Sequence, residues 1–277
     1  MNTDTTWKSG YVEANGIKMH YTRTGSDKPP LVMAHGLTDN GLCWTPVVEA
    51  LAADYELIMF DARGHGLSDA PETGYSNAAH AADYAAAIQA VGLARPALIG
   101  HSMGAATGAQ LAALYPDLLA CLLLEDPPWR PLAEAASPEG QRAMAEEWRA
   151  NVIAQQQMSR EALLAAGKRD RPTWSDAEFA PWLEAKLQVS PRALDYVSAG
   201  NDHWTSYVPR IACPTLLITG DVELGAIVSP QLAREVVALN PRVIVAHIAG
   251  AGHSVRREQF ASYVAAVRDF LRQSYRS

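Results

Sequence analysis

The feature that most constrains the fold of this chain is the stretch 98–105, which reads Leu-Ile-Gly-His-Ser-Met-Gly-Ala. A short apolar run precedes it and a long alanine-rich run follows it, so it lies between a predicted buried strand and a predicted helix. A G-x-S-x-G pattern in that position is typical of a sharp strand-to-helix turn that exposes its serine at the edge of a sheet. The sequence therefore predicts a strand, a strained turn at Ser102 and a helix in immediate succession.

This turn would give Ser102 the setting that a serine nucleophile needs. A serine hydroxyl is a weak nucleophile unless it is held exposed beside a base. Gly100 and Gly104 carry no side chains that would block the close approach of helix to strand. The amide of Met103 would lie at the helix N-terminus, where it can donate to a developing oxyanion. We therefore predict Ser102 as a nucleophile and the Met103 amide as an oxyanion donor.

Apolar runs alternate with helix-favouring segments along most of the chain. An N-terminal hairpin is predicted around Asn15-Gly16, with strands at 11–13 and 17–22. Further strands are predicted at 31–34, 56–60, 97–99, 118–124, 214–219 and 243–247. Helices are predicted at 43–53, 76–91, 103–115, 230–239 and 258–272. This alternation predicts an α/β fold whose sheet is mostly parallel and carries helices on both faces.

The character of the sequence changes after Asp126-Pro127-Pro128-Trp129. From 129 to 207 the pattern is helical, with several Trp and Pro residues and no strand signal. We predict that residues 129–207, called the cap segment below, form a helical cap. The core would then consist of residues 1–128 and 208–277.

Charge and composition exclude several function classes. The net charge of −7 over 277 residues argues against nucleic acid or an anionic membrane as the main partner. No apolar run is long enough to span a bilayer, and the first eight residues lack the features of a secretory signal. The three cysteines are widely spaced, which favours reduced thiols and gives no zinc-site pattern. We expect a cytoplasmic protein that uses no metal or cofactor and acts on a small molecule; a homodimer is compatible with the sequence.

Three more segments accompany the serine turn: His35-Gly36 after an early strand, the glycine-rich loop 61–69, and Gly250-Ala251-Gly252-His253 near the C-terminus. With these, the chain resembles the α/β-hydrolase fold family over nearly its whole length. The resemblance implies an eight-stranded, mostly parallel sheet and the chain order nucleophile, acid, base. It also implies His253 as the base and the amide of Leu37 as the second oxyanion donor. The other seven histidines are expected to be structural.

The resemblance leaves two places for the acid that orients His253. One is the loop after the strand that follows the cap segment, where Glu223 holds the common position and Asp221 lies nearby. The other is the end of the strand after the nucleophile helix, where Asp126 lies; certain lactonases and a cofactor-degrading amide hydrolase use this place. We favour Asp126 and keep Glu223 as the alternative. A competing explanation gives Asp126 a structural role, capping the turn into Pro127-Pro128 and pairing with Arg130.

Related dehalogenases and epoxide hydrolases carry Asp at the nucleophile position, so Ser102 argues against both activities and favours acyl chemistry. We predict a cofactor-independent serine hydrolase that cleaves small carboxylic esters through an acyl-enzyme. Lactones, small amides and the carbon–carbon bonds of ring-cleavage products are the alternative substrates, and a non-catalytic ligand receptor is the rival from another class. Trp129 is predicted to contact the substrate because it directly follows the expected edge of the site. Other large side chains could line the pocket or pack the cap segment: Trp44, Trp174, Trp182, Trp204, Tyr207, Met144 and Met158.

Overall fold

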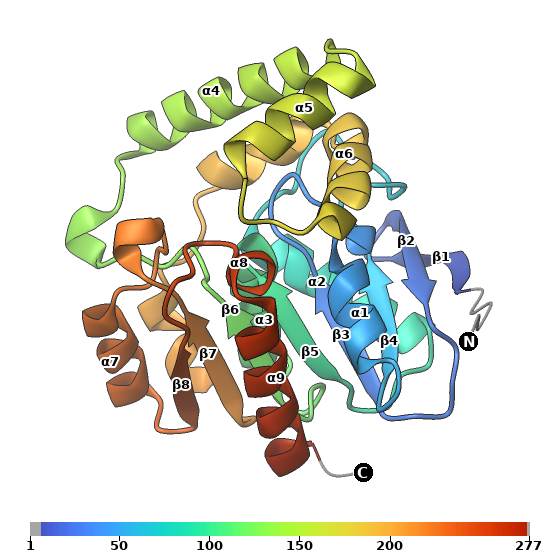
Figure 1. Cartoon of the computed structure of the whole chain (residues 1–277). Coiled ribbons are helices and arrows are strands. Elements are labelled where there is room, and N and C mark those ends of the chain that lie inside the picture. Colours follow the sequence, from blue (N-terminus) through green and yellow to red (C-terminus); the bar gives the residue numbers. More distant parts are fainter. Residues whose placement is uncertain (1–6, 276–277) are drawn as a thin grey trace.

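A computed structural model describes residues 7–275 of the chain. Residues 1–6, which contributed to the prediction that a secretory signal is absent, lie outside the described residues. Figure 1 shows a twisted central sheet with helices on both faces and a further group of helices above one end of the strands. This arrangement confirms the predicted α/β class.

The sheet has eight strands in the order β1-β2-β4-β3-β5-β6-β7-β8. Their bounds are β1 Lys8–Ala14, β2 Ile17–Arg23, β3 Pro30–Ala34, β4 Glu56–Phe60, β5 Ala97–His101, β6 Leu122–Glu125, β7 Thr215–Thr219 and β8 Val243–His247. The hairpin β1–β2 and the pair β2–β4 are antiparallel, and every other pairing is parallel. The eight-stranded, mostly parallel sheet predicted from the family resemblance is therefore confirmed.

Two apolar layers hold the core helices on the sheet. The helices are α1 Thr45–Leu51, α2 Asn77–Ala90, α3 Met103–Leu114, α7 Pro230–Leu239, α8 Val255–Glu258 and α9 Phe260–Ser274. One buried cluster joins α1 and α9 to one face of the strands, and a second joins α2, α3 and α7 to the other. Because parallel strands buried on both faces need apolar side chains in both directions, their sequences are continuous apolar runs.

Among the predicted elements that begin at other residues than expected are the strand 118–124 and the helix 43–53. The apolar run 118–124 is a strand only from Leu122, because its first residues form the turn that leaves α3: the amide of Leu118 donates to Tyr115 O. The predicted helix 43–53 is a 3₁₀ turn, Gly41–Trp44, followed by α1. Pro46 lies in the first turn of α1, where its missing N–H costs no hydrogen bond.

The cap segment contains α4 Pro138–Gln156, α5 Arg160–Asp170 and α6 Phe179–Gln188, together with several 3₁₀ turns and no strand. Serine side chains cap the first two of these helices: Ser137 accepts from Gly140 N, and Ser159 accepts from Ala162 N. These helices lie above the carboxyl ends of the parallel strands (Figure 1). The division of the chain into a core and a cap remains a prediction.

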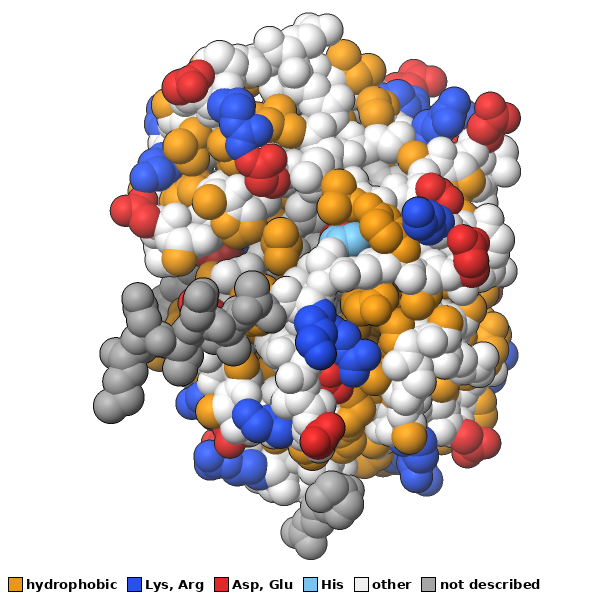
Figure 2. All heavy atoms as spheres, turned by 90° about the vertical axis from the view of Figure 1, so that its right-hand side faces the viewer, with side chains coloured by type: hydrophobic (Ala, Val, Ile, Leu, Met, Phe, Trp, Pro, Cys, Tyr) orange, Lys and Arg blue, Asp and Glu red, His pale blue; other side chains and the backbone are white. Residues whose placement is uncertain are grey.

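No helix between residues 7 and 275 is both long enough and apolar enough to cross a membrane. Within the same range, no group of three or more His, Cys, Asp and Glu residues is placed to hold a metal ion. Cys43, Cys121 and Cys213 are buried and unpaired. Figure 2 shows one face of the molecule, on which side chains of both charges are scattered among apolar and uncharged ones.

Candidate active site

The turn between β5 and α3 has the strained geometry that the sequence predicts. Ser102 has φ 51° and ψ −116°, outside the regions that non-glycine residues ordinarily adopt. A Cβ on Gly100 would lie 2.3 Å from Gly104 O, and a Cβ on Gly104 would lie 2.1 Å from Ala34 O. Helix and strands therefore approach too closely for any larger residue at either glycine. Met103 is the first residue of α3, so its amide belongs to the helix end that has no intrahelical acceptor.

His253 hydrogen-bonds to Asp126, with 2.7 Å between Nδ1 and Oδ2. The Asp126 side chain is fully buried, whereas that of His253 is 34% exposed. The amides of Ile227 and Val228 also donate to the Asp126 carboxylate, at 2.8 and 2.9 Å. Because Asp126 accepts the Nδ1 proton, the neutral imidazole presents its Nε2 lone pair on the opposite side of the ring.

The other two acid candidates lie elsewhere. Glu223 is exposed on the 3₁₀ turn Val222–Leu224. Asp221 accepts from Gly250 N and pairs with His247 at 3.0 Å. Of the three carboxylates, the structure brings only Asp126 to His253, which is the arrangement the sequence argument favoured.

A cavity of about 150 Å³ has three of the predicted site residues in its walls. The core contributes Ser102, His253 and Leu37 to its walls, and the cap segment contributes Arg171, Trp174, Trp182 and Lys186. The remaining lining residues are Gly36, Asp39, His101, Ser254 and Arg257. The cavity therefore lies between the carboxyl ends of the strands and the cap segment.

Trp129, predicted to contact substrate, does not line this cavity. It is buried in an aromatic cluster, where its Nε1 donates to the Tyr207 hydroxyl at 2.9 Å and its ring stacks on Trp204 at 5.9 Å. These contacts fasten the start of the cap segment to its end. Trp174 and Trp182, two of the other large side chains considered from the sequence, do line the cavity.

Two buried histidines hold the loop 35–39 that carries Leu37. His35 donates from Nδ1 to Gly36 O and accepts from the Ala62 amide at Nε2. His65 accepts from the Thr38 amide at 3.3 Å and donates to Arg63 O. Burial lowers the pKa of both rings, that of His65 to about 3, so both are neutral and can accept these bonds. They have the structural role expected from the sequence.

Asp39 is the centre of a buried charge network that forms part of the cavity wall. Its carboxylate lies 3.1 Å from Arg257, 3.2 Å from Arg256 and 3.5 Å from Lys186. Burial alone would raise the pKa of Asp39, but these three cations hold it well below its usual value. Arg256 also pairs with Glu125. The network thus joins the loop after Leu37, the segment after His253, the residue before Asp126 and helix α6.

Arg171, which directly follows α5, lines the cavity but has no carboxylate partner among the described residues. Its guanidinium lies 5.1 Å from the ring centres of both Trp174 and Trp182. Among residues 7–275, no carboxylate forms an ion pair with Arg171 across the cavity. Burial lowers the pKa of Arg171, and the nearby charge of Arg257 lowers it further. A half-buried guanidinium in this position is a ready binding group for an anion.

Comparison with known proteins identifies the family. A family model described as the alpha/beta hydrolase fold matches residues 29–255. The chain belongs to the α/β-hydrolase fold family. It is 33% identical over 273 residues to an N-formylmaleamate deformylase of Pseudomonas putida, covering 95% of this chain and 96% of that protein.

Two solved structures extend this similarity to three dimensions. The crystal structure of E-2-(acetamidomethylene)succinate hydrolase has a TM-score of 0.80 and 26% identity, and the match covers 96% of this chain and 99% of the other. The N-formylmaleamic acid deformylase of Pseudomonas putida has a TM-score of 0.79 and 25% identity, with 94% and 100% covered. Together with the family match, these relatives identify this α/β-hydrolase as an enzyme that hydrolyses small molecules.

The sequence patterns did not predict the charged side of the cavity, which Asp39, Arg171, Lys186 and Arg257 form. One usable signal was the pair Arg256-Arg257, which follows His253 within four residues. Another was the four-residue spacing of Trp182 and Lys186, which places both on one face of a helix. Neither signal states what the side chains face, because their partners are far away in the sequence.

Proposed function

We propose that this α/β-hydrolase is a serine hydrolase that cleaves the amide bond of a small N-acyl compound bearing a carboxylate. The observation that carries the proposal is the composition of the cavity. Ser102 and His253 lie on its core side, and Arg171, without a carboxylate partner, lies on its cap side. The relatives favour amide over ester because their names, N-formylmaleamate deformylase and 2-(acetamidomethylene)succinate hydrolase, describe N-acyl carboxylates.

In the proposed reaction, the Ser102 oxygen attacks the amide carbonyl while His253 Nε2 accepts the hydroxyl proton. The amides of Leu37 and Met103 stabilise the oxyanion of the tetrahedral intermediate. His253 returns the proton to the leaving nitrogen, so the C–N bond breaks and the acyl group stays on Ser102. A water molecule, deprotonated by His253, then releases the acid and regenerates the hydroxyl. Asp126 holds the imidazole in the required tautomer and stabilises its cation.

The substrate carboxylate is assigned to Arg171. A guanidinium binds a carboxylate through two parallel hydrogen bonds, and the flanking rings of Trp174 and Trp182 restrict its position. The other cavity cations, Lys186 and Arg257, are already paired with Asp39. The small volume of the cavity favours a compact substrate over a long acyl chain.

Small carboxylic esters, the first prediction from the sequence, are the second candidate substrates. The same serine, base and oxyanion donors suit esters, since the tetrahedral intermediate is the same. The position of Arg171 favours an ester that also carries a carboxylate over a neutral one.

A matched panel of substrates tests the proposal. It contains N-formylmaleamate, acetamidomethylenesuccinate, the methyl esters of both, and p-nitrophenyl acetate, with the Ser102→Ala variant as the control. We expect kcat/KM for at least one free acid to exceed that of its methyl ester by about a hundredfold, which corresponds to about 2.7 kcal/mol of transition-state binding. Turnover of esters alone would replace the proposal by the second candidate. Failure of a fluorophosphonate to label Ser102 in the folded protein would remove the serine mechanism altogether.

A further inference from the structure

Lys186 lies on α6 of the cap segment, but its ammonium group reaches the loop that carries Leu37. Its Nζ donates to Thr38 O at 2.8 Å and to Thr38 Oγ1 at 2.6 Å, across a separation of 148 residues. It also lies 3.5 Å from Asp39 Oδ1, and its side chain is 8% exposed. An ammonium group has three N–H donors, so these three acceptors account for all of them.

The turn that Lys186 contacts has an unusual conformation. The Asp39 amide donates to Gly36 O at 3.1 Å, which closes a four-residue turn with Leu37 and Thr38 in its centre. Thr38 has φ 66°, the left-handed region that the third position of a type II turn requires and that glycine ordinarily fills. A β-branched residue is strained in this conformation and adopts it only where contacts with its surroundings restrain the backbone. The two bonds from Lys186 supply such a restraint.

We propose that Lys186 is a positioning residue that holds the Gly36–Asp39 turn in the conformation from which the Leu37 amide donates to the oxyanion. This inference rests on the proposed serine hydrolase mechanism. Lys186 comes from the cap segment and Leu37 from the core, so the oxyanion site is complete only while α6 is docked. Docking of the cap segment and assembly of the oxyanion site are then one event.

The rival role for Lys186 is direct binding of the substrate carboxylate, since it also lines the cavity. A neutral substrate separates the two roles, because it has no carboxylate to bind. The experiment therefore compares wild type with Lys186→Met on p-nitrophenyl acetate; methionine keeps much of the length and removes the donors. The matched control is Lys168→Met, which removes an exposed lysine of α5 that pairs with Asp176.

We expect Lys186→Met to lower kcat for the neutral ester about thirtyfold to three-hundredfold, and to change KM by less than about threefold. This is less than the roughly hundredfold to thousandfold loss seen when an oxyanion donor is removed, because the Leu37 amide is displaced and not deleted. The affinity for a boronic acid that forms a tetrahedral adduct with Ser102 is expected to fall in parallel. Lys168→Met is expected to stay within about twofold of wild type in both measurements. An unchanged kcat on the neutral ester, with a raised KM only for carboxylate substrates, would overturn the proposal in favour of direct binding.

A second variant tests the link to backbone strain. Thr38→Gly removes the strain at φ 66°, so in the Lys186→Met background it is expected to recover about tenfold in kcat. A merely structural lysine would give no such recovery, and its absence would contradict the proposal. If Lys186→Met gives no cooperative thermal transition, Lys186→Gln replaces it: this side chain is shorter and has two N–H donors instead of three, so it cannot make all three contacts of Lys186. We then expect a lowered kcat with threonine at 38 and a kcat close to wild type with glycine there, and equal kcat values for the two would contradict the proposal. If the Ser102→Ala variant hydrolysed the ester as fast as wild type, that result would instead count against the proposed function.

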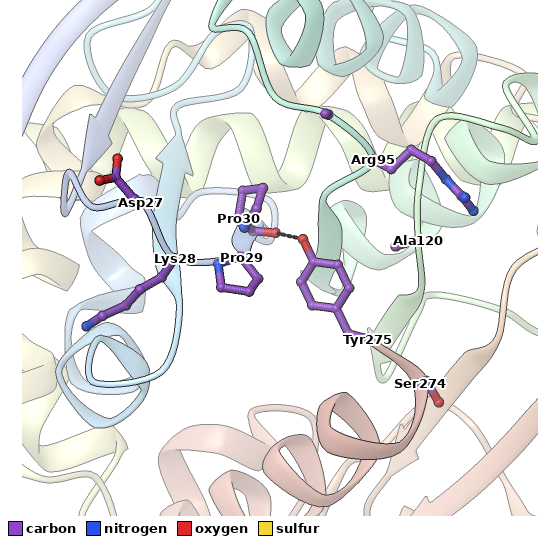
Figure 3. Close-up of a pocket in the computed structure, with 9 residues that line it drawn as sticks. Asp27, Lys28, Pro29, Pro30, Arg95, Ala120, Ser274 and Tyr275 are labelled. Carbon is purple, nitrogen blue, oxygen red and sulfur yellow. Dashed lines mark hydrogen bonds between the residues drawn. The ribbon is translucent and has the colours of Figure 1, made fainter. Parts of the chain in front are cut away.

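The molecule has a second, larger cavity. It measures about 620 Å³ and is lined by Pro30, Arg95 and Tyr275, at the opposite end of the strands from Ser102. Figure 3 shows the Tyr275 hydroxyl turned toward Pro30, to whose carbonyl it donates at 2.8 Å. The hydroxyl of Tyr275 therefore has its hydrogen-bond partner within the fold.

Discussion

At the scale of single residues, burial and hydrogen bonding distinguish two carboxylates that the sequence left as alternatives. Asp126 is fully buried and accepts from two amides and from His253, whereas Glu223 faces solvent. A buried carboxylate without donors would be costly, so the hydrogen bonds from the amides of Ile227 and Val228 offset the cost of burying Asp126 beside the imidazole. A solvated carboxylate on a surface turn has no comparable influence on His253.

Paired substitutions test this distinction. Asp126→Asn is expected to lower kcat at least about a thousandfold, because an amide side chain favours the wrong tautomer of His253. Glu223→Gln is expected to lower kcat by less than about tenfold. Steady-state rates on the best ester or amide substrate, with thermal melting to check folding, measure both. The opposite order of losses would move the acid to Glu223.

Arg171 gives a second prediction at this scale. Arg171→Gln removes the unpaired guanidinium and keeps polar character. We expect KM for a carboxylate-bearing substrate to rise about thirtyfold or more, the equivalent of about 2 kcal/mol, with little change for p-nitrophenyl acetate. Equal losses on both substrates would show that Arg171 supports the fold of the cavity and does not select its ligand.

At the scale of elements, the close contact between α3 and the strands creates the strained turn. The two glycines allow this contact, and the register of β5 between β3 and β6 places Ser102 beside the end of β6, where its amide donates to Glu125 O. The same register brings Asp126, one residue further along, to the carboxyl edge. The turn and the acid are therefore neighbours because their strands are neighbours.

Two alanine substitutions compare this contact with an open helix position. Gly104→Ala places a Cβ 2.1 Å from Ala34 O, so α3 must shift, and we expect a loss of about 3 kcal/mol or more in the free energy of unfolding together with loss of activity. Gly140→Ala, in the first turn of α4, meets nothing closer than 3.5 Å and is expected to change stability by less than about 1 kcal/mol, in the stabilising direction. Urea denaturation measures both. Similar effects at the two positions would contradict the packing argument.

At the scale of the whole molecule, the core contains several histidines that fold in the neutral form. His80 is the most isolated of them: its side chain is buried between Tyr75 and Tyr196, and neither ring nitrogen has a hydrogen-bond partner among the described residues. Burial lowers its pKa well below the usual 6.5. In the unfolded chain the same ring binds a proton near pH 6.5.

The sign of the pH dependence follows from this difference. Above pH 6.5 the ring is neutral in both states, so stability does not change. Below pH 6.5 the unfolded chain binds the proton first, and stability falls as the pH decreases toward the folded pKa. His80→Leu should therefore reduce the loss of stability between pH 7.5 and 5.5 by about 1.4 kcal/mol. Urea denaturation at the two pH values measures it, and parallel losses in variant and wild type would be incompatible with a buried neutral His80.

Much of the fold could be predicted because its signals are short-range. The bounds of β4, α7 and β8 match the predicted ranges 56–60, 230–239 and 243–247, since apolar periodicity and turn residues act within a few positions of the chain. The turn at Ser102 was predictable for the same reason, because two glycines around a serine determine how closely the adjoining helix and strand can approach. The start of β6 could not be predicted in this way, since Leu119 and Cys121 are buried like strand residues although they precede the strand.

The sequence by itself determined the alternation of elements, the strained serine and the order of the candidate groups along the chain. Only the tertiary structure decided which carboxylate meets His253, that Trp129 packs away from the cavity, and that Arg171 and Lys186 face it. The physical reason is that these outcomes depend on contacts between distant segments: 127 residues separate Asp126 from His253, and 148 separate Thr38 from Lys186. Patterns of local spacing carry no information about such pairs, whose energies exist only once the sheet has brought them together.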